Sequence, residues 1–83
     1  MDRLSSCRKK IDSIDRKIVG LLKSRFKIAS RISSLKKSGN IRIADKKREL
    51  EVLGNVKMRS RNHHKFLIVI FKKIISYSKK LQK

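Results

Sequence analysis

The stretch LSSCRKKIDSIDRKIVGLLKSRFKIASRISSL, residues 4–35, decides how this chain folds. Its apolar positions alternate steps of three and four residues, which predicts one stripe along a single long helix. One arginine interrupts the stripe formed by Leu4, Cys7, Ile11, Ile14, Ile18, Leu21, Arg25, Ile28, Ile32 and Leu35. The guanidinium of Arg25 loses its hydration on a packing face unless an anion meets it, and the chain has 6 acidic residues against 25 basic ones. The first helix alone therefore raises the hypothesis of a bound anionic ligand.

The composition of the 83 residues indicates one all-α domain over residues 1–83. The chain has no proline and only three glycines, so it lacks the turn residues of an all-β fold. Cys7 has no second cysteine to pair with, which favours a packing role and a reducing compartment. No signal-peptide pattern opens the chain, and the apolar run Phe66–Phe71 is too short to span a bilayer. We therefore expect a soluble cytoplasmic protein without a membrane partner.

Three helices account for the pattern of the chain. The first runs from about Arg3 to Lys37, and a left-handed cap and an extended link occupy residues 38–44. Asp45 is the expected N-cap of the second helix, and residues 59–64 form a polar connection to the third. The first helix is about 50 Å long, which the rest of so short a chain cannot cover. We therefore expect an oligomer.

The formal net charge of +19 indicates either a polyanionic partner or a lysine-rich solvated surface. The four aromatic residues all fit on or beside apolar stripes, so they form no platform on which nucleic-acid bases would stack. The lysines are spread over the whole chain. A positive field also steers a small anionic substrate, and we therefore treat nucleic-acid binding as the less favoured interpretation.

Several polar residues fall on the predicted apolar faces. Lys36 follows Arg25 by about three helical turns, so the two side chains project in nearly the same direction, roughly 16 Å apart along the axis. Ser78 and Gln82 lie four residues apart on the face of the third helix. Each also has a simpler interpretation, because Arg25 and Lys36 can extend their charged ends to water, Ser78 can be a small core residue and Gln82 an exposed one.

The start of the second helix carries a charged cluster of Asp45, Arg48 and Glu49. Asp45 and Glu49 share one face of that helix, so both carboxylates are available to one site. The alternative is an ordinary helix cap followed by solvated charges. His63 and His64 are expected in the connection, and two adjacent histidines without further ligands make a poor metal site.

Taken in order, these positions resemble the all-helical chorismate mutases over nearly the whole chain. Residues 7–15 look like the signature of the family's first helix, residues 45–49 match its Asp-x-x-Arg-Glu at the start of the second, and residues 78–82 match its Ser-x-x-x-Gln. Eight polar positions carry the resemblance: Arg8, Arg25, Lys36, Asp45, Arg48, Glu49, Ser78 and Gln82.

The resemblance implies an intertwined homodimer of three-helix subunits with two equivalent sites. Arg8 and Arg25 are about 25 Å apart along one helix, too far to hold the same small molecule, so Arg8 of the partner subunit is expected to enter the site. The implied reaction is the [3,3] rearrangement of chorismate to prephenate in phenylalanine and tyrosine biosynthesis, without cofactor or metal. The enzyme holds a flexible dianion in its reactive chair and stabilises charge on the ether oxygen.

The resemblance also implies a role for each residue. The substrate carboxylates are assigned to Arg25, Arg48 and Arg8 of the partner subunit, with Ser78 in support and no arginine tied to a particular carboxylate. The ether oxygen and the neighbouring carboxylate region are assigned to Lys36 and Gln82. The ring hydroxyl is assigned to Glu49, with Asp45 nearby. The expected catalytic residues are therefore Lys36, Gln82, Glu49 and Arg25.

Two departures from the family and two alternatives accompany this interpretation. The second connection looks a few residues short, and Gln82 is the second-last residue, so fraying is expected to weaken its contact. Isochorismate pyruvate-lyases share the scaffold, but Arg48 is followed here by Glu49, the hydroxyl partner expected of a mutase. A basic helical nucleic-acid-binding protein is the alternative from another class, and it would give Arg25 and Gln82 no special role.

Overall fold

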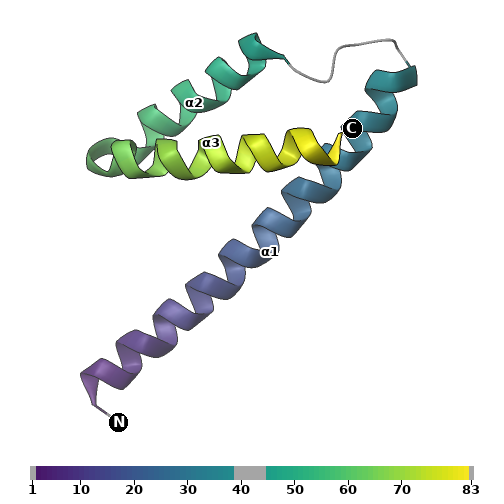
Figure 1. Ribbon diagram of the computed structural model, residues 1–83. Coiled ribbons are helices and arrows are strands. Elements are labelled where there is room, and N and C mark those ends of the chain that lie inside the picture. Colours follow the sequence, from purple (N-terminus) through teal and green to yellow (C-terminus); the bar gives the residue numbers. More distant parts are fainter. Residues whose placement is uncertain (1, 39–44, 83) are drawn as a thin grey trace.

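A computed structural model describes residues 2–38 and 45–82, and the side chains of residues 36–38 are not described (Figure 1). The described residues form three α-helices and one short 3-10 turn: α1 (Arg3–Ser38), α2 (Lys46–Ser60), η1 (Arg61–His63) and α3 (His64–Leu81). The predicted all-α class is therefore confirmed. No helix among the described residues is long and apolar enough to cross a bilayer.

Aspartates cap the first two helices. The Ser5 N–H donates to Asp2 Oδ1 at 2.7 Å, and this backbone hydrogen bond is the main reason why the pKa of Asp2 lies below its usual value. The Arg48 N–H donates to Asp45 Oδ1 at 3.1 Å, as the predicted N-cap requires. The cap and link expected over residues 39–44 lie outside the described residues.

The connection between α2 and α3 differs from the expected polar loop over residues 59–64. Helix α2 continues to Ser60, η1 follows, and His64 already opens α3. Arg61 has a φ of 52°, a left-handed backbone value that is uncommon for a residue with a side chain and that reverses the chain here. The His64 ring nitrogen Nδ1 lies 2.8 Å from the Arg61 carbonyl oxygen. The connection is therefore a tight corner, since short-range hydrogen bonds replace the loop.

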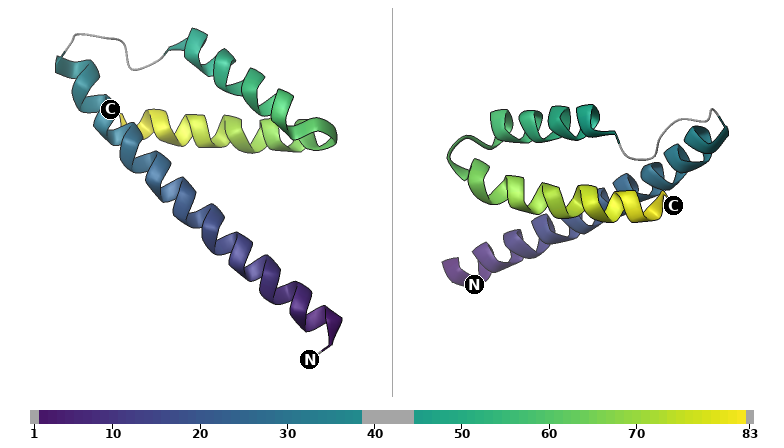
Figure 2. Two further views of the ribbon diagram at one scale, coloured as in Figure 1. Left: turned by 180° about the vertical axis from the view of Figure 1, so that it is seen from behind. Right: turned by 45° about the horizontal axis from the view of Figure 1, so that its top comes forward.

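The α2–α3 hairpin packs against only one end of α1. Both views show α3 crossing the C-terminal half of α1, while the N-terminal half extends away from the hairpin (Figures 1 and 2). The subunit measures 57 × 25 × 15 Å and has a radius of gyration of 16.3 Å, against about 12 Å for a compact chain of this length. The subunit is therefore too elongated to cover its own first helix.

The core lies at the crossing of α1 and α3. Its buried residues are few and mostly small or polar: Ala29, Ser33, Ile74, Ser78 and Gln82. Phe26 and Tyr77 meet edge to face beside this crossing, with ring centroids 4.8 Å apart. Small side chains at a crossing allow two helices to approach closely, which explains why α3 lies on this part of α1.

The face of α1 that contacts α3 lies beside the apolar stripe and shares Arg25 with it. Ile14, Ile18 and Leu21 on the stripe are 53%, 49% and 71% exposed, whereas Ala29 and Ser33, beside the stripe, are 5% and 6% exposed. The stripe is too long and too regular for the short hairpin to cover, so the subunit buries a second face. An exposed apolar stripe of this length is typical of a surface that another molecule covers.

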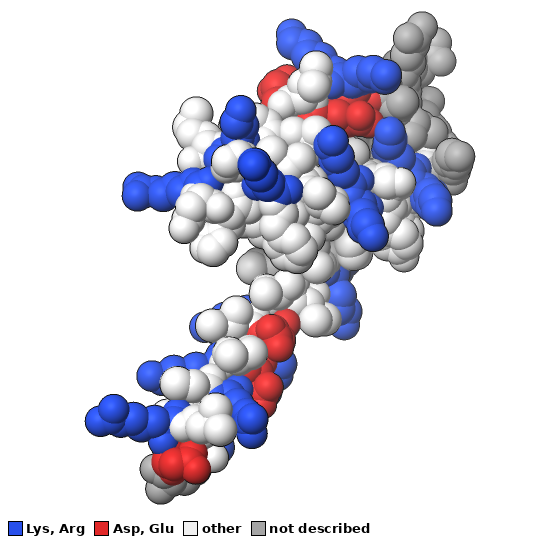
Figure 3. Space-filling view, turned by 60° about the vertical axis from the view of Figure 1, so that its left-hand side comes forward, with Lys and Arg blue, Asp and Glu red and all other residues white. Residues whose placement is uncertain are grey.

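Basic side chains are distributed over the whole molecule. Figure 3 shows lysines and arginines along α1 and across the hairpin, with acidic side chains between them. The view therefore shows scattered charges on this face, consistent with the even spread of lysine along the sequence.

We predict that a second copy of the chain covers the stripe. Ile14→Glu places a carboxylate in the expected contact and should raise the dissociation constant of a dimer by about 30-fold or more. Sedimentation velocity over a range of concentrations measures this constant. Lys23→Glu is the matched control, because Lys23 lies nine residues on, on the opposite side of the helix, and is exposed. A wild-type chain that stays monomeric at every concentration would contradict the prediction.

Candidate functional site

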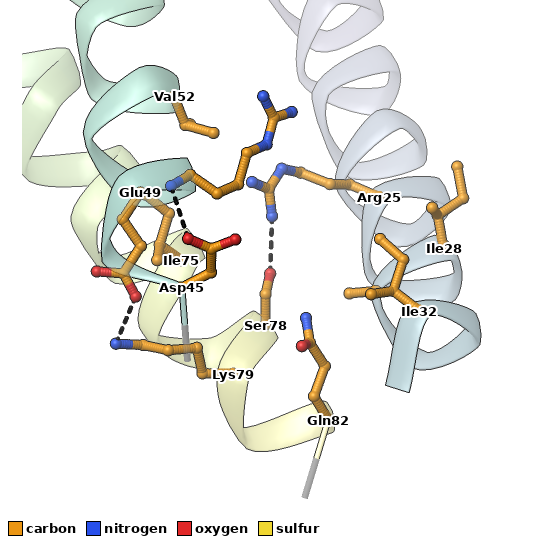
Figure 4. Close-up of a pocket in the computed structure, with 12 residues that line it drawn as sticks. Arg25, Ile28, Ile32, Asp45, Glu49, Val52, Ile75, Ser78, Lys79 and Gln82 are labelled. Carbon is orange, nitrogen blue, oxygen red and sulfur yellow. Dashed lines mark hydrogen bonds and ion pairs between the residues drawn. The ribbon is translucent and has the colours of Figure 1, made fainter. Parts of the chain in front are cut away.

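A cavity of about 330 Å³ lies where the middle of α1 meets the start of α2 and the end of α3 (Figure 4). Six of the eight residues singled out from the sequence line it: Arg25, Asp45, Arg48, Glu49, Ser78 and Gln82. They come from three helices and from positions up to 57 residues apart (25 to 82). The structure therefore brings together residues that spacing alone gave as separate pairs and clusters and that the family resemblance assigned to one site.

Arg25 is the central cation of the cavity. Its Nη1 donates to Ser78 Oγ at 2.7 Å, and both side chains point into the same space (Figure 4). Burial is the main cause that lowers the pKa of Arg25, and the nearby positive charge of Arg48 lowers it further. Among the described residues Arg25 has no carboxylate partner, only a neutral hydroxyl. A half-buried cation beside a second cation favours an anionic ligand between them.

The carboxylates that line the cavity already have partners. Asp45 accepts a hydrogen bond from the start of α2, as its simpler interpretation predicted. Glu49 Oε1 lies 2.8 Å from Lys79 Nζ, with Glu49 25% and Lys79 40% exposed. Arg48 forms only a longer 3.7 Å contact with Glu51, and both of these side chains are largely in solvent. The two carboxylates therefore do not neutralise the arginines, which remain available to a ligand.

Gln82 is held at the end of the third helix by two hydrogen bonds of its backbone. Its N–H donates to the Lys79 carbonyl oxygen at 3.1 Å, and its own carbonyl accepts from Ser33 Oγ at 2.8 Å. Its side chain is 9% exposed and extends toward Ser78 and Arg25 (Figure 4). The Oε1 atom is buried without a hydrogen-bond partner among the described residues. Buried polar atoms are nearly always paired, so this atom indicates space for a further polar group.

The apolar wall and one lysine of the cavity were not singled out from the sequence. Ile28 and Ile32 extend from α1, while Val52 and Ile75 close the hairpin side (Figure 4). The two isoleucines of α1 belong to the predicted stripe, so the stripe was a signal that could have found them. Lys79 carried no signal, because its partner Glu49 lies 30 residues away on another helix.

Of the other two predicted residues, one lies away from this cavity and the side chain of the other is not described. The side chain of Lys36 lies outside the described part of the structure, although its backbone continues α1. Arg8 is exposed near the N-terminus of α1, about 25 Å along the helix from Arg25. One subunit therefore presents the cavity without Arg8.

The comparisons with known proteins agree with this arrangement. The family model of chorismate mutase type II matches residues 7–83. The chain is 33% identical to a chorismate mutase of Methanocaldococcus jannaschii, with all of this chain and 87% of that protein covered. It is also 33% identical to a bifunctional chorismate mutase/prephenate dehydratase of Aquifex aeolicus, of which it covers 25%.

A solved structure supports the fold. It is a conserved hypothetical protein from Pyrococcus furiosus, 41% identical, with a TM-score of 0.79 and with 100% of this chain and 99% of that chain covered. Sequence, fold and a cavity lined by two arginines and a buried glutamine thus agree, and the chain belongs to the chorismate mutase type II family, whose members are isomerases.

Proposed function

We propose that this chorismate mutase binds chorismate in the cavity between α1 and the hairpin, and that Arg8 of the partner subunit completes the site. The observation that carries the proposal is the half-buried Arg25, which lies near Arg48 and, among the described residues, has only the Ser78 hydroxyl as its partner. Arg25 has lost part of its hydration and is repelled by Arg48. A bound dicarboxylate offsets both effects, because it forms charge-assisted hydrogen bonds and places negative charge between the two guanidinium groups.

The rearrangement of chorismate is unimolecular, since a C–O bond breaks while a C–C bond forms within one molecule. The protein therefore needs no nucleophile, and its contribution is to hold the substrate in the compact chair from which the reaction proceeds. Arg25 and Arg48 bind the carboxylates from one side of the cavity, and Ile28 and Ile32 wall its α1 side. An apolar wall beside fixed cations restricts the substrate to a folded conformation.

Charge develops on the ether oxygen as the C–O bond breaks, and donors aimed at that oxygen stabilise the transition state more than the ground state. We assign this role to the Gln82 amide, whose terminal turn is anchored, and to Lys36. Glu49 accepts a hydrogen bond from the ring hydroxyl of the substrate, with Asp45 nearby. Glu49 must then share its carboxylate between the hydroxyl and Lys79, which lies 2.8 Å away in the free protein.

We favour chorismate over the two alternatives for reasons of chemistry. A nucleic-acid-binding protein leaves the burial of Arg25 and Gln82 without explanation, and its basic residues would gather on one face. A lyase acting on isochorismate does not require the carboxylate of Glu49 beside Arg48. A homodimer in the cytoplasm also remains part of the proposal, which rests on the exposed apolar stripe and on the unpaired Cys7.

Incubation with chorismate tests the function directly. We expect loss of the ultraviolet absorbance of chorismate together with formation of prephenate, and an Arg25→Met chain with kcat/KM at least about 100-fold lower. Arg25→Met should change the thermal stability of the free protein little, because loss of the hydrogen bond to Ser78 is offset by removal of a half-buried charge beside Arg48. Arg16→Met is the control, since Arg16 is exposed and lies away from the cavity. Loss of chorismate with release of pyruvate would support the lyase instead.

Subunit mixing tests the contribution of Arg8. Arg8→Ala and Arg25→Ala chains should each be inactive as homodimers, whereas a heterodimer contains one site with both arginines intact. After exchange of equal amounts, about a quarter of wild-type activity should return, because half of the dimers are mixed and each has one of two sites intact. Absence of recovery after exchange has been verified by mass spectrometry would exclude a shared site.

The pH dependence of a Gln82→Glu variant tests contact with the ether oxygen. An amide donates its hydrogen bond at every ordinary pH, whereas a carboxyl group donates only when protonated, with an unperturbed pKa near ~4.3. Wild-type kcat should therefore vary little around neutrality, while kcat of Gln82→Glu rises as the pH falls. Gln82→Ala should be slow and should lack this rise. Superimposable pH profiles for wild type and Gln82→Glu would remove Gln82 from the ether oxygen.

A further inference from the structure

We propose that Ser33 is a positioning residue for Gln82, an inference that rests on the role proposed for Gln82 above. Ser33 is 6% exposed on α1, and its hydroxyl donates to the backbone carbonyl of Gln82 at 2.8 Å. Ser33 is absent from the residues that line the cavity. Its influence on the reaction must therefore pass through Gln82.

The contact solves a problem at the end of α3. The last carbonyls of a helix have no intrahelical donor, so they need a partner from elsewhere when they are buried. Gln82 is the C-cap of α3, its φ of −93° and ψ of 0° lie outside the helical range, and its carbonyl is buried. The Ser33 hydroxyl supplies the missing donor from a different helix. One side-chain hydrogen bond thus joins the last turn of α3 to α1.

The direction of this hydrogen bond distinguishes Ser33 from an ordinary helix serine. A serine within a helix commonly donates to the carbonyl four residues earlier, as Ser60 does to Val56 here. Ser33 instead donates across the helix crossing to a residue 49 positions away. Because a hydroxyl has one hydrogen to donate, Ser33 cannot donate to a carbonyl of its own helix while it donates to Gln82.

The anchored carbonyl and the functional amide belong to the same residue. Holding the Gln82 backbone against α1 fixes where its side chain begins, and that side chain extends toward Ser78 and Arg25 (Figure 4). A small displacement of a positioned donor is costly to a transition state, since the donor must meet one oxygen at hydrogen-bond distance. Loss of the Ser33 hydroxyl therefore reduces turnover without touching the substrate.

A double-mutant cycle between Ser33 and Gln82 tests the inference. Ser33→Ala keeps helix propensity and removes only the hydroxyl, and we expect kcat for chorismate to fall about tenfold with KM changed less than about threefold. In a Gln82→Ala background the same change should alter kcat less than about twofold, because no amide remains to be positioned. Ser30→Ala is the matched control, an exposed serine one turn earlier on α1 whose loss should leave kcat unchanged.

A second variant separates the hydrogen bond from the volume of the side chain. Ser33→Cys fills the same space with a weaker donor, so it should lose activity as Ser33→Ala does. Full activity in Ser33→Cys, or an equal loss from Ser33→Ala in both backgrounds, would show a packing role and overturn the inference. Full activity in Gln82→Ala would instead remove the proposed role of Gln82, and with it that of Ser33. Circular dichroism melting verifies that each compared variant is folded.

Discussion

The crossing of α1 and α3 is the contact on which the rest of the subunit depends. Within the described part of the chain, two hydrogen bonds join the helices there, from Arg25 to Ser78 and from Ser33 to the Gln82 carbonyl. Ala29 lies between Arg25 and Ser33 on α1 and is 5% exposed, so the helices pack closely between the two bonds. This crossing sets the position of the hairpin. Because α1 and α3 cross closely, the cavity residues of α1 lie next to those of α2 and α3.

The charges of the cavity divide into those with partners and those without. Asp45 is committed to the start of α2, and Glu49 to Lys79, so neither carboxylate neutralises Arg25. Arg25 and Arg48 remain as neighbouring cations. Burial, and then the charge of Arg48, lower the pKa of Arg25, so the arrangement is unfavourable in the free protein. Unfavourable charge of this kind is concentrated at functional sites, where a ligand relieves it. The charge of Arg25 therefore lowers the stability of the free chain but raises its affinity for an anion.

Helix α1 presents two different faces. Near its C-terminal end a face of small residues, represented by Ala29 and Ser33, contacts α3, while the apolar stripe beside it remains exposed. The N-terminal half, which carries Arg8, extends away from the hairpin (Figure 2). In the dimer that we propose, pairing of the two α1 helices along the stripe also brings Arg8 of each chain to the site of the other. Assembly and completion of the active site then become one event.

The sequence by itself determined the helical class, the Asp45 cap and six of the residues that line the cavity, because helix periodicity, capping chemistry and motif spacing are local. It did not determine which residues of α1 meet α3, since Ala29 and Ser33 lie beside the apolar stripe and periodicity alone does not mark them. Nor did it reveal that Glu49 pairs with Lys79, or that Ser33 holds the Gln82 carbonyl. Those pairs join residues 30 and 49 positions apart, and only the crossing of the helices decides which distant side chains come within hydrogen-bond distance.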